Sequence, residues 1–281
     1  MISRRAFLLT AGGMAAAMAG TVGYTFEVEP EWLDITQVNL QIRKLPASMV
    51  GKRVVQFSDI HIGPGVSDDY VRESFATVDA LTPDVVVVTG DLISQHPEQF
   101  EHAEAIYAAL PHGSLGTFVS FGNHDYGRDW AEPAVAARLR GTLENLGITV
   151  LVNEVGMAGE LQVVGLGDLW AKQFDPVRAF SRVDPAAAQL ALSHNPDSVD
   201  LPGWGAYDGW VLAGHTHGGQ CKPPFLPPPM LPVKNRRYTS GAFDLSRGRQ
   251  LYINRGLGTI MYPVRFNVRP EVTVFSLQSA D

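Results

Sequence analysis

One stretch decides the fold of this 281-residue chain: Asp84-Val85-Val86-Val87-Val88-Thr89-Gly90-Asp91. Its four consecutive valines leave no polar face, so they predict a strand that is covered on both sides, as in a parallel sheet with helices outside. Gly90 then breaks the strand and leaves a carboxylate, Asp91, at its end. The rest of the chain repeats this arrangement.

Strands of the same kind are predicted at 53–58 and 117–120, and each ends in polar residues. Asp59-Ile60-His61 follows the first, and Gly122-Asn123-His124-Asp125 follows the second. Apolar residues at helical spacing predict helices between and after these strands, at about 67–82, 98–110 and 135–147. This alternation predicts parallel strands with helices on the outside, and it gathers the polar groups at one edge of the sheet.

The remainder of the chain is predicted to be mostly strands, at 36–42, 148–151, 161–164, 190–193, 210–213, 238–243, 250–254 and 271–277. Two of these strands also end in imidazoles, with His194 after one and Gly214-His215-Thr216-His217 after the other. The proline-rich segment 222–232 is interpreted as an ordered loop near the site. A hinge between domains is the alternative, but no independent core follows, so residues 27–281 are predicted to form a single domain.

Composition narrows the class of protein. Hydrophobic residues make up 45% of the chain and charged residues 18%, which suits a globular domain with a sizeable core. The net charge of −7 argues against a nucleic-acid surface. The one cysteine, Cys221, excludes an intramolecular disulfide and a cysteine zinc cluster.

Residues 1–26 are predicted to be a targeting segment. Ser3-Arg4-Arg5-Ala6-Phe7-Leu8 resembles a twin-arginine export signal, and the uncharged run that follows is about 15 residues long, short for a membrane span. A buried helix is the alternative. The resemblance implies recognition by the twin-arginine machinery as a folded protein. The expected location is the periplasm or the outer face of the cytoplasmic membrane. Cleavage of the segment, or its retention as a membrane anchor, is left open.

Five strand ends together supply seven side chains that bind metals in proteins, namely Asp59, His61, Asp91, Asn123, His194, His215 and His217. One ion with an open position needs three or four protein ligands, so this set fits two ions. Paired ions about 3.5–4 Å apart recur in phosphoester hydrolysis. One carboxylate must bridge them, and Asp91 follows the most buried strand. Each residue alone has an ordinary explanation as a cap, turn or core residue, and the joint occurrence carries the prediction.

Two further residues are candidates for catalysis. His124 can carry a proton near neutral pH, and Asp125 can accept a hydrogen bond from an imidazole and so fix its orientation. A simple turn is the alternative, because Gly, Asn and Asp are common turn residues.

In order and spacing, the motifs resemble the full set of the calcineurin-like metallophosphoesterases, over about residues 50–280. The resemblance implies an α/β fold, a four-layer α-β-β-α sandwich of two mixed β-sheets. It also implies two divalent ions with a bridging hydroxide that attacks phosphorus. Asp59, His61, Asp91 and His217 would hold one ion, and Asp91, Asn123, His194 and His215 the other. His124 would act as general acid, oriented by Asp125.

A closer resemblance is to the exported YaeI-type phosphodiesterases, through Gly167-Asp168-Leu169-Trp170-Ala171 and His194-Asn195-Pro196-Asp197 among other runs. It implies a phosphodiesterase. We expect a monomer with a small-molecule or lipid-linked phosphoester substrate, and the set of imidazole, carboxylate and amide donors accepts Mn, Fe, Zn or Co. Arg128 and Asn195 are candidates for substrate contact, and Asp168 for a second-layer acceptor or a turn residue. Two alternatives stay open, a non-catalytic metal-dependent scaffold and a pyrophosphatase acting on a lipid-linked nucleotide.

Overall fold

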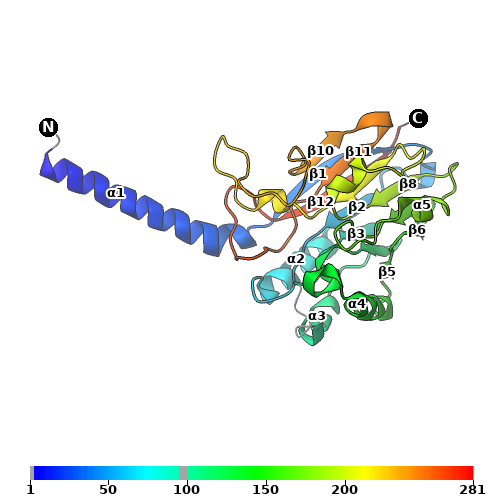
Figure 1. Cartoon of the computed structure of the whole chain (residues 1–281), viewed down its shortest axis with the longest axis horizontal. Helices are drawn as coiled ribbons and strands as arrows, with labels where there is room; N and C mark the ends of the chain where they lie inside the picture. The colour runs from blue at the N-terminus through cyan, green and yellow to red at the C-terminus, as the bar shows by residue number, and fades with distance from the viewer. Residues whose placement is uncertain (1–2, 95–99, 281) are drawn as a thin grey trace.

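The computed structural model describes residues 3–94 and 100–280. Two six-stranded β-sheets pack face to face, with helices on the outside (Figure 1). The strands are β1 (Asp34–Ile42), β2 (Arg53–Phe57), β3 (Val85–Thr89), β4 (Thr117–Ser120), β5 (Thr149–Val150), β6 (Glu154–Ala158), β7 (Leu161–Gly165), β8 (Gln189–Leu192), β9 (Trp210–Ala213), β10 (Gly241–Asp244), β11 (Gln250–Ile253) and β12 (Glu271–Ser279). The α-helices that follow the first strand are α2 (Asp68–Ala80), α3 (Phe100–Tyr107), α4 (Pro133–Asn145) and α5 (Pro176–Phe180).

The first sheet has the order β1-β12-β2-β3-β4-β5, and β2, β3 and β4 are parallel as the alternating pattern predicted. β5 continues this parallel arrangement, although the sequence pattern grouped it with the later strands. The valines of β3 show why all four are apolar. Val86 and Val88 belong to the cluster that packs against the helices, and Val85 and Val87 belong to the cluster between the sheets. Successive side chains of a strand point to opposite faces, so a strand covered on both faces needs apolar residues throughout.

The second sheet has the order β10-β11-β9-β8-β7-β6, with β7, β8, β9 and β11 parallel to one another. Its inner face meets the first sheet through Leu190, Leu212 and other residues of the shared core. Its outer face is covered by α5 and by a non-helical segment that carries Trp204 and Tyr207. The predicted α/β sandwich of two mixed sheets is therefore confirmed, and its fourth layer consists mainly of loops.

Several elements differ from the prediction. The sequence pattern missed β6, because this partly exposed strand contains Gly156 and lacks clean alternation. It missed α5 because five residues are too short to show a helical period. The helix predicted at 98–110 ends at Tyr107, and positions 98 and 99 lie outside the described residues. The strand predicted at 238–243 is β10 and begins at Gly241.

The N-terminal segment forms α1 (Arg4–Gly23), which projects from one end of the sandwich (Figure 1). Its larger apolar side chains, such as Leu9 and Met18, are exposed, so the alternative of a buried helix is wrong. Two hydrogen bonds tie the junction after α1 to the body. The Arg265 amide donates to the Thr25 carbonyl at 3.1 Å, and the Val268 amide donates to Glu29 Oε1 at 2.6 Å. None of the helices in the described residues is long and apolar enough to cross a membrane.

Candidate metal centre

The polar motifs of both sheets meet at one place, the edge where β2, β3, β4, β8 and β9 end. All seven predicted ligands are buried, and so are His124 and Asp125. Parallel strands bring their carboxyl ends to a common edge, which is why motifs from separate parts of the chain converge. Within the described residues, six of the seven ligands form two triads with donor atoms within 4.8 Å of one another.

The first triad consists of Asp59, His61 and His217. The Nε2 atoms of the two imidazoles lie 3.1 Å apart, and His217 Nε2 lies 3.3 Å from Asp59 Oδ1. The His215 amide donates to both carboxylate oxygens of Asp59 at 3.0 Å, so the backbone of the second imidazole motif holds this carboxylate in place. Three donor atoms thus face a common point.

The second triad consists of Asp91, His194 and His215. His194 Nε2 lies 3.1 Å from Asp91 Oδ2 and 3.1 Å from His215 Nδ1. The other ring nitrogen of His194 is 2.6 Å from the Thr89 carbonyl. A carbonyl only accepts, so His194 Nδ1 carries a proton and Nε2 is directed at the site, an arrangement typical of metal-binding histidines.

Asp91 connects the two triads. Its Oδ2 atom is 3.1 Å from His194 in its own triad and 3.6 Å from His61 in the other. Its Oδ1 atom accepts a hydrogen bond of 2.9 Å from the His124 amide. The carboxylate that the sequence singled out as the bridge therefore lies between the two groups of donors.

Asn123 completes the donor set. Its side chain is fully buried, and neither atom of its amide has a hydrogen-bond partner among the described residues. A buried amide without a hydrogen-bond partner lowers the stability of the fold by about 1–3 kcal/mol. A bound ligand that contacts the Asn123 side chain would remove this cost. A carbonyl-type oxygen beside carboxylates and imidazoles is a donor that borderline divalent cations accept. The residues present therefore fit a pair of metal ions.

Most of the predicted metal ligands have a backbone conformation that is uncommon for residues other than glycine. Five of the seven predicted ligands have a positive φ, in the left-handed region: Asp59 at 50°, His61 at 50°, Asp91 at 53°, His215 at 70° and His217 at 49°. Aspartate and histidine are among the side chains enriched in this region, but each such residue still costs about 1–3 kcal/mol. Such conformations are typical of functional sites.

Glycines beside the ligands make room for them. A Cβ atom at Gly122 would lie 2.2 Å from Asp91 Oδ1, and one at Gly214 would lie 2.3 Å from Asp59 Oδ2. Any larger residue would displace a metal ligand. This is the physical reason for the Gly-Asn and Gly-His pairs in the sequence.

The proton affinities of three of the four imidazoles suit metal binding. Burial, which disfavours the charged ring, lowers the pKa of His61 and of His215 to about 3 and holds the pKa of His217 well below its ordinary value. These three rings are neutral at physiological pH and offer a lone pair. Burial also acts to lower the pKa of His194, but the nearby Asp91 carboxylate outweighs it and raises this pKa well above its ordinary value.

His124 lies beside the triads and belongs to neither. Its ring meets the His61 ring edge-on, with 4.9 Å between centroids, and it lines a cavity of about 550 Å³ that opens onto the site. It is 8% exposed, more than any of the seven predicted ligands. This position agrees with a group that contacts substrate, and its role as general acid stays a prediction.

The Asp125 carboxylate accepts hydrogen bonds from backbone amides on two turns. The donors are Gly122 at 2.8 Å, Asp91 at 2.9 Å, Leu92 at 2.8 Å and Ile93 at 3.3 Å. Asp125 therefore fastens the turn after β4 to the turn after β3 and fixes Asp91 between the triads. The orienting role toward His124 stays a prediction, whereas this structural role is visible directly.

Sequence reasoning overlooked two tryptophans beside the metal ligands, of which Trp170 lines the cavity. The Trp170 ring meets the His215 ring edge-on at 4.4 Å between centroids, and Trp130 lies 4.9 Å from Trp170. Asp168 supports the position of Trp170, because its Oδ1 accepts a 2.7 Å hydrogen bond from the Ala171 amide and closes the turn that carries Trp170. The run Gly167 to Ala171 was a signal for this tryptophan, although its role could not be read from it.

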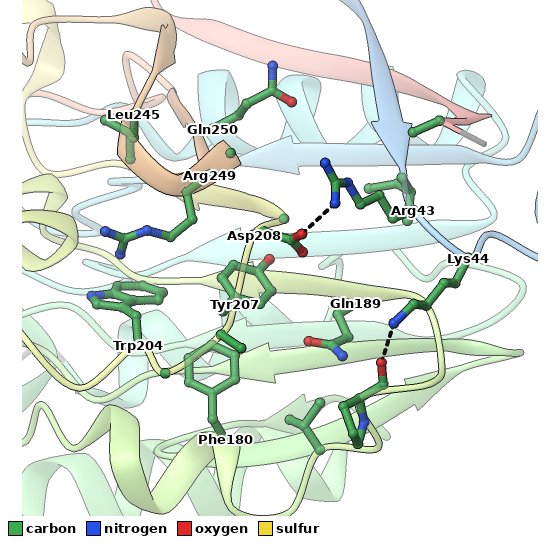
Figure 2. A pocket seen from close by; sticks show the side chains of 18 of the residues that line it. Arg43, Lys44, Phe180, Gln189, Trp204, Tyr207, Asp208, Leu245, Arg249 and Gln250 are labelled. Atoms are coloured by element: carbon green, nitrogen blue, oxygen red, sulfur yellow. Dashed lines mark hydrogen bonds and ion pairs between the residues drawn. The ribbon is translucent and has the colours of Figure 1, made fainter.

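Another cavity, of about 830 Å³, lies at the opposite edge of the second sheet, where β8 and β11 begin (Figure 2). Its prominent cations have partners within the chain. Arg43 pairs with Asp208 at 2.7 Å, and the Arg249 guanidinium lies over the Trp204 ring at 5.2 Å. None of the predicted ligands lines it. The metal centre is therefore the stronger candidate site. Of the proposed substrate contacts, Arg128 and Asn195 line neither cavity.

Comparison with known proteins agrees with the geometry. The chain is similar to the uncharacterized metallophosphoesterase YkuE of Bacillus subtilis (30% identity, 100% of this chain and 99% of that protein) and to the phosphodiesterase YaeI of Escherichia coli (32% identity, 99% and 100%). It is 28% identical to the UDP-2,3-diacylglucosamine pyrophosphatase LpxG of Chlamydia trachomatis, over 87% of this chain and 89% of that protein.

Residues 52–219 match the calcineurin-like phosphoesterase family, and they contain both triads, Asn123 and His124. Together with two buried clusters of His and Asp donors at the carboxyl edge of a two-sheet sandwich, this match identifies the chain as a calcineurin-like metallophosphoesterase, a metal-dependent hydrolase of phosphoric esters.

Proposed function

We propose that this metallophosphoesterase is a phosphodiesterase that works with two divalent metal ions. The observation that carries the proposal is the position of Asp91, whose Oδ2 atom lies 3.1 Å from a histidine of one triad and 3.6 Å from a histidine of the other. A shared carboxylate is what a paired site requires. The similarity to the phosphodiesterase YaeI supports the choice of a diester substrate.

The chain's own residues supply the frame for the reaction. Asp59, His61 and His217 would hold one ion, and Asn123, His194 and His215 the other, with Asp91 shared. When bound, two such ions lower the pKa of a water molecule and neutralise charge on the phosphoryl oxygens. Asp125 and the Thr89 carbonyl keep Asp91 and His194 in position through the hydrogen bonds described above.

His124 would deliver the proton. In hydrolysis the oxygen of water bonds to phosphorus, the ester P–O bond breaks, and the leaving oxygen needs a proton. His124 faces the cavity next to both triads, so it can supply that proton without giving up a metal. Ring contacts connect His124 through Trp130 and Trp170 to His215, so two indole rings pack beside the imidazoles on this side of the site.

A second candidate function is hydrolysis of the pyrophosphate of a lipid-linked nucleotide. Apolar side chains of Leu231, Ile260 and Val264 line the same cavity as the metal ligands and would accommodate acyl chains. The similarity to the pyrophosphatase LpxG points the same way. Parallel assays with an aryl phosphodiester and with a diacylated nucleotide pyrophosphate in liposomes separate the two functions.

Metal removal is expected to abolish hydrolysis of bis(4-nitrophenyl) phosphate, because both triads would lose the ions that activate water. The measurement is the release of nitrophenolate before chelation, after chelation, and after addition of Mn, Fe, Zn or Co singly. We expect restored activity with at least one of these ions, and two equivalents of metal per chain by elemental analysis.

Full activity in metal-free protein would contradict a metal-dependent mechanism. Metal binding without hydrolysis of any phosphoester would instead support the non-catalytic scaffold. The metal-free protein should also be checked by circular dichroism, so that a loss of activity through unfolding is recognised.

We also propose that residues 1–26 direct export through the twin-arginine route to the periplasm or the outer face of the cytoplasmic membrane. The support is the Arg4-Arg5 pair at the start of an exposed helix that stands clear of the sandwich (Figure 1).

Arg4→Lys with Arg5→Lys is expected to leave the protein in the cytoplasm, because a receptor reads the arginine pair. Cell fractionation measures this, with Arg178→Lys and Arg182→Lys as the matched control; unchanged envelope localisation of the first variant would refute the proposal.

A further inference from the structure

The mouth of the metal-site cavity carries an exposed apolar patch, here called the apolar rim. It consists of Phe225, Leu226, Met230, Met261 and Tyr262, each at least 60% exposed. These residues come from two loops far apart in the sequence. Single exposed apolar side chains are ordinary, but a group of large ones at the entrance of a site marks a surface that contacts something else.

The apolar rim is continuous with the catalytic site. Met230, Met261 and Tyr262 line the same cavity of about 550 Å³ that His124, His215 and His217 line. A ligand in contact with the rim can therefore extend to the metal ligands without leaving the cavity.

The two loops are held in a fixed arrangement. Gln220, three residues after His217, joins them: its Nε2 donates to the Ile260 carbonyl at 3.1 Å, and its Oε1 accepts from the Ile260 amide at 2.9 Å. Arg236 Nη2 donates to the Pro228 carbonyl at 2.9 Å and secures the proline-rich loop. These hydrogen bonds tie the two loops to the body and to each other, and the apolar side chains of the rim remain exposed to water.

Basic side chains occur in the segment that carries three of the five rim residues, although Asp197 and Asp200 accept hydrogen bonds from its residues 234, 235 and 238. Positions 220–240 contain no Asp or Glu and four exposed cations, Lys222, Lys234, Arg236 and Arg237, although the whole chain has a net charge of −7. Apolar side chains with flanking Lys and Arg are the combination that binds an anionic lipid surface, through insertion and through attraction to headgroups.

The apolar helix α1 leaves the body next to the apolar rim. Its junction is bonded to Arg265 and Val268, a few residues after Tyr262. Figure 1 shows α1 and the loops before β10 and β12 at the same end of the sandwich. Two apolar features, one a helix and one a pair of loops, thus occur on one side of the molecule.

From these observations we infer that the apolar rim docks on an anionic lipid bilayer and that the enzyme takes acyl-bearing phosphoesters from it. The inference rests on the proposed phosphodiesterase function and specifies its substrate class. The phosphate of such a lipid would reach the metal centre, and its acyl chains would lie along Met230, Met261 and Tyr262. Phe225 and Leu226, which do not line the cavity, would enter the interface of the bilayer.

The test compares two substrates with the same leaving group. One is bis(4-nitrophenyl) phosphate in solution, and the other is a diacylglycerol 4-nitrophenyl phosphodiester in phosphatidylglycerol-containing vesicles. For the full chain with Phe225→Ser and Leu226→Ser, the vesicle rate is expected to fall roughly tenfold or more, because two large apolar side chains no longer leave water. The rate in solution should not change. Met157→Ser with Val177→Ser is the matched control, since both residues are exposed at a distance on β6 and α5 (Figure 1).

A local measurement separates the apolar rim from α1, which is itself apolar. Phe225→Trp should show fluorescence that brominated lipids quench, whereas Val177→Trp should not gain quenching over the native tryptophans. Lys222→Gln and Lys234→Gln should each weaken binding to phosphatidylglycerol vesicles by roughly fivefold, and leave the weaker binding to phosphatidylcholine vesicles unchanged.

Each failure is distinguishable. No added quenching in the Phe225→Trp variant, together with an unchanged vesicle rate in the Phe225 and Leu226 double variant, would overturn membrane docking while the soluble assay still supports the phosphodiesterase. No hydrolysis of the soluble ester by the wild-type protein would overturn the proposed function, and docking would then be decided by the quenching. A wild-type dimer that becomes a monomer in the double variant, with no vesicle effect, would show that a second copy covers the rim.

Discussion

Asp91→Asn is expected to reduce the metal content from two ions to at most one per chain and to lower phosphodiesterase activity by at least about 10²–10³-fold, the range for loss of one group that stabilises the transition state directly. The Asp91 carboxylate lies between the triads, 3.1 Å from His194 and 3.6 Å from His61. The amide lacks the negative charge that screens two neighbouring cations from each other. Elemental analysis and initial rates on the purified variant measure the two effects.

Asp84→Asn is the matched control for this variant, because Asp84 lies at the other end of the same strand and pairs with Lys52 at 2.9 Å. It should keep both ions and full activity. Two ions retained in Asp91→Asn, together with near-normal activity, would show that Asp91 does not bridge the site.

His124→Ala is expected to keep both ions and lower kcat by roughly 10²–10⁴-fold, the usual range for a positioned acid or base. His124 faces the cavity outside both triads, so its removal should affect proton delivery and leave metal binding intact. The loss should be larger for a poor leaving group, which needs a proton, than for 4-nitrophenolate. Kinetics on an alkyl ester and an aryl ester of the same phosphate, beside metal analysis, measure this difference.

His102→Ala supplies the same substitution on the surface, where His102 Nε2 lies 2.9 Å from Asp68, and it should change neither quantity. Loss of an ion in His124→Ala would make His124 a ligand and contradict its assignment. Equal losses for both leaving groups would show that His124 positions the substrate and that the acid lies elsewhere, with Asp168 the next residue to test.

Much of the fold and site was predictable because the two depend on the same pattern. A strand such as β3 must be apolar on both faces, and the turn after it must carry whatever the site needs, so Val85 to Val88 and Asp91 are visible together in the sequence. The glycines before Asn123 and His215 are visible for the same reason, since a Cβ atom there would meet a ligand. Order along the chain was then enough to assemble the donor set.

What could not be predicted depends on contacts between distant segments. Trp170 reaches His215 only because β7 and β9 belong to the same sheet, and no local pattern reveals this. The Asp125 carboxylate accepts four hydrogen bonds from backbone amides. Every residue except proline has such an amide, so the sequence cannot reveal which ones Asp125 contacts. The apolar rim could not be predicted either, because Met261 and Tyr262 line a cavity with Met230 only in the folded chain.

The left-handed backbone at five of the metal ligands has a consequence for how this protein tolerates mutation. Glycine is the residue best suited to a positive φ, so replacement of Asp59, His61 or His217 by glycine would relax the main chain even as it removed a donor atom. Stability and chemistry therefore oppose each other at these positions. Random mutagenesis with selection only for a folded, soluble protein would therefore remove the metal ligands first, while the two-sheet fold is retained.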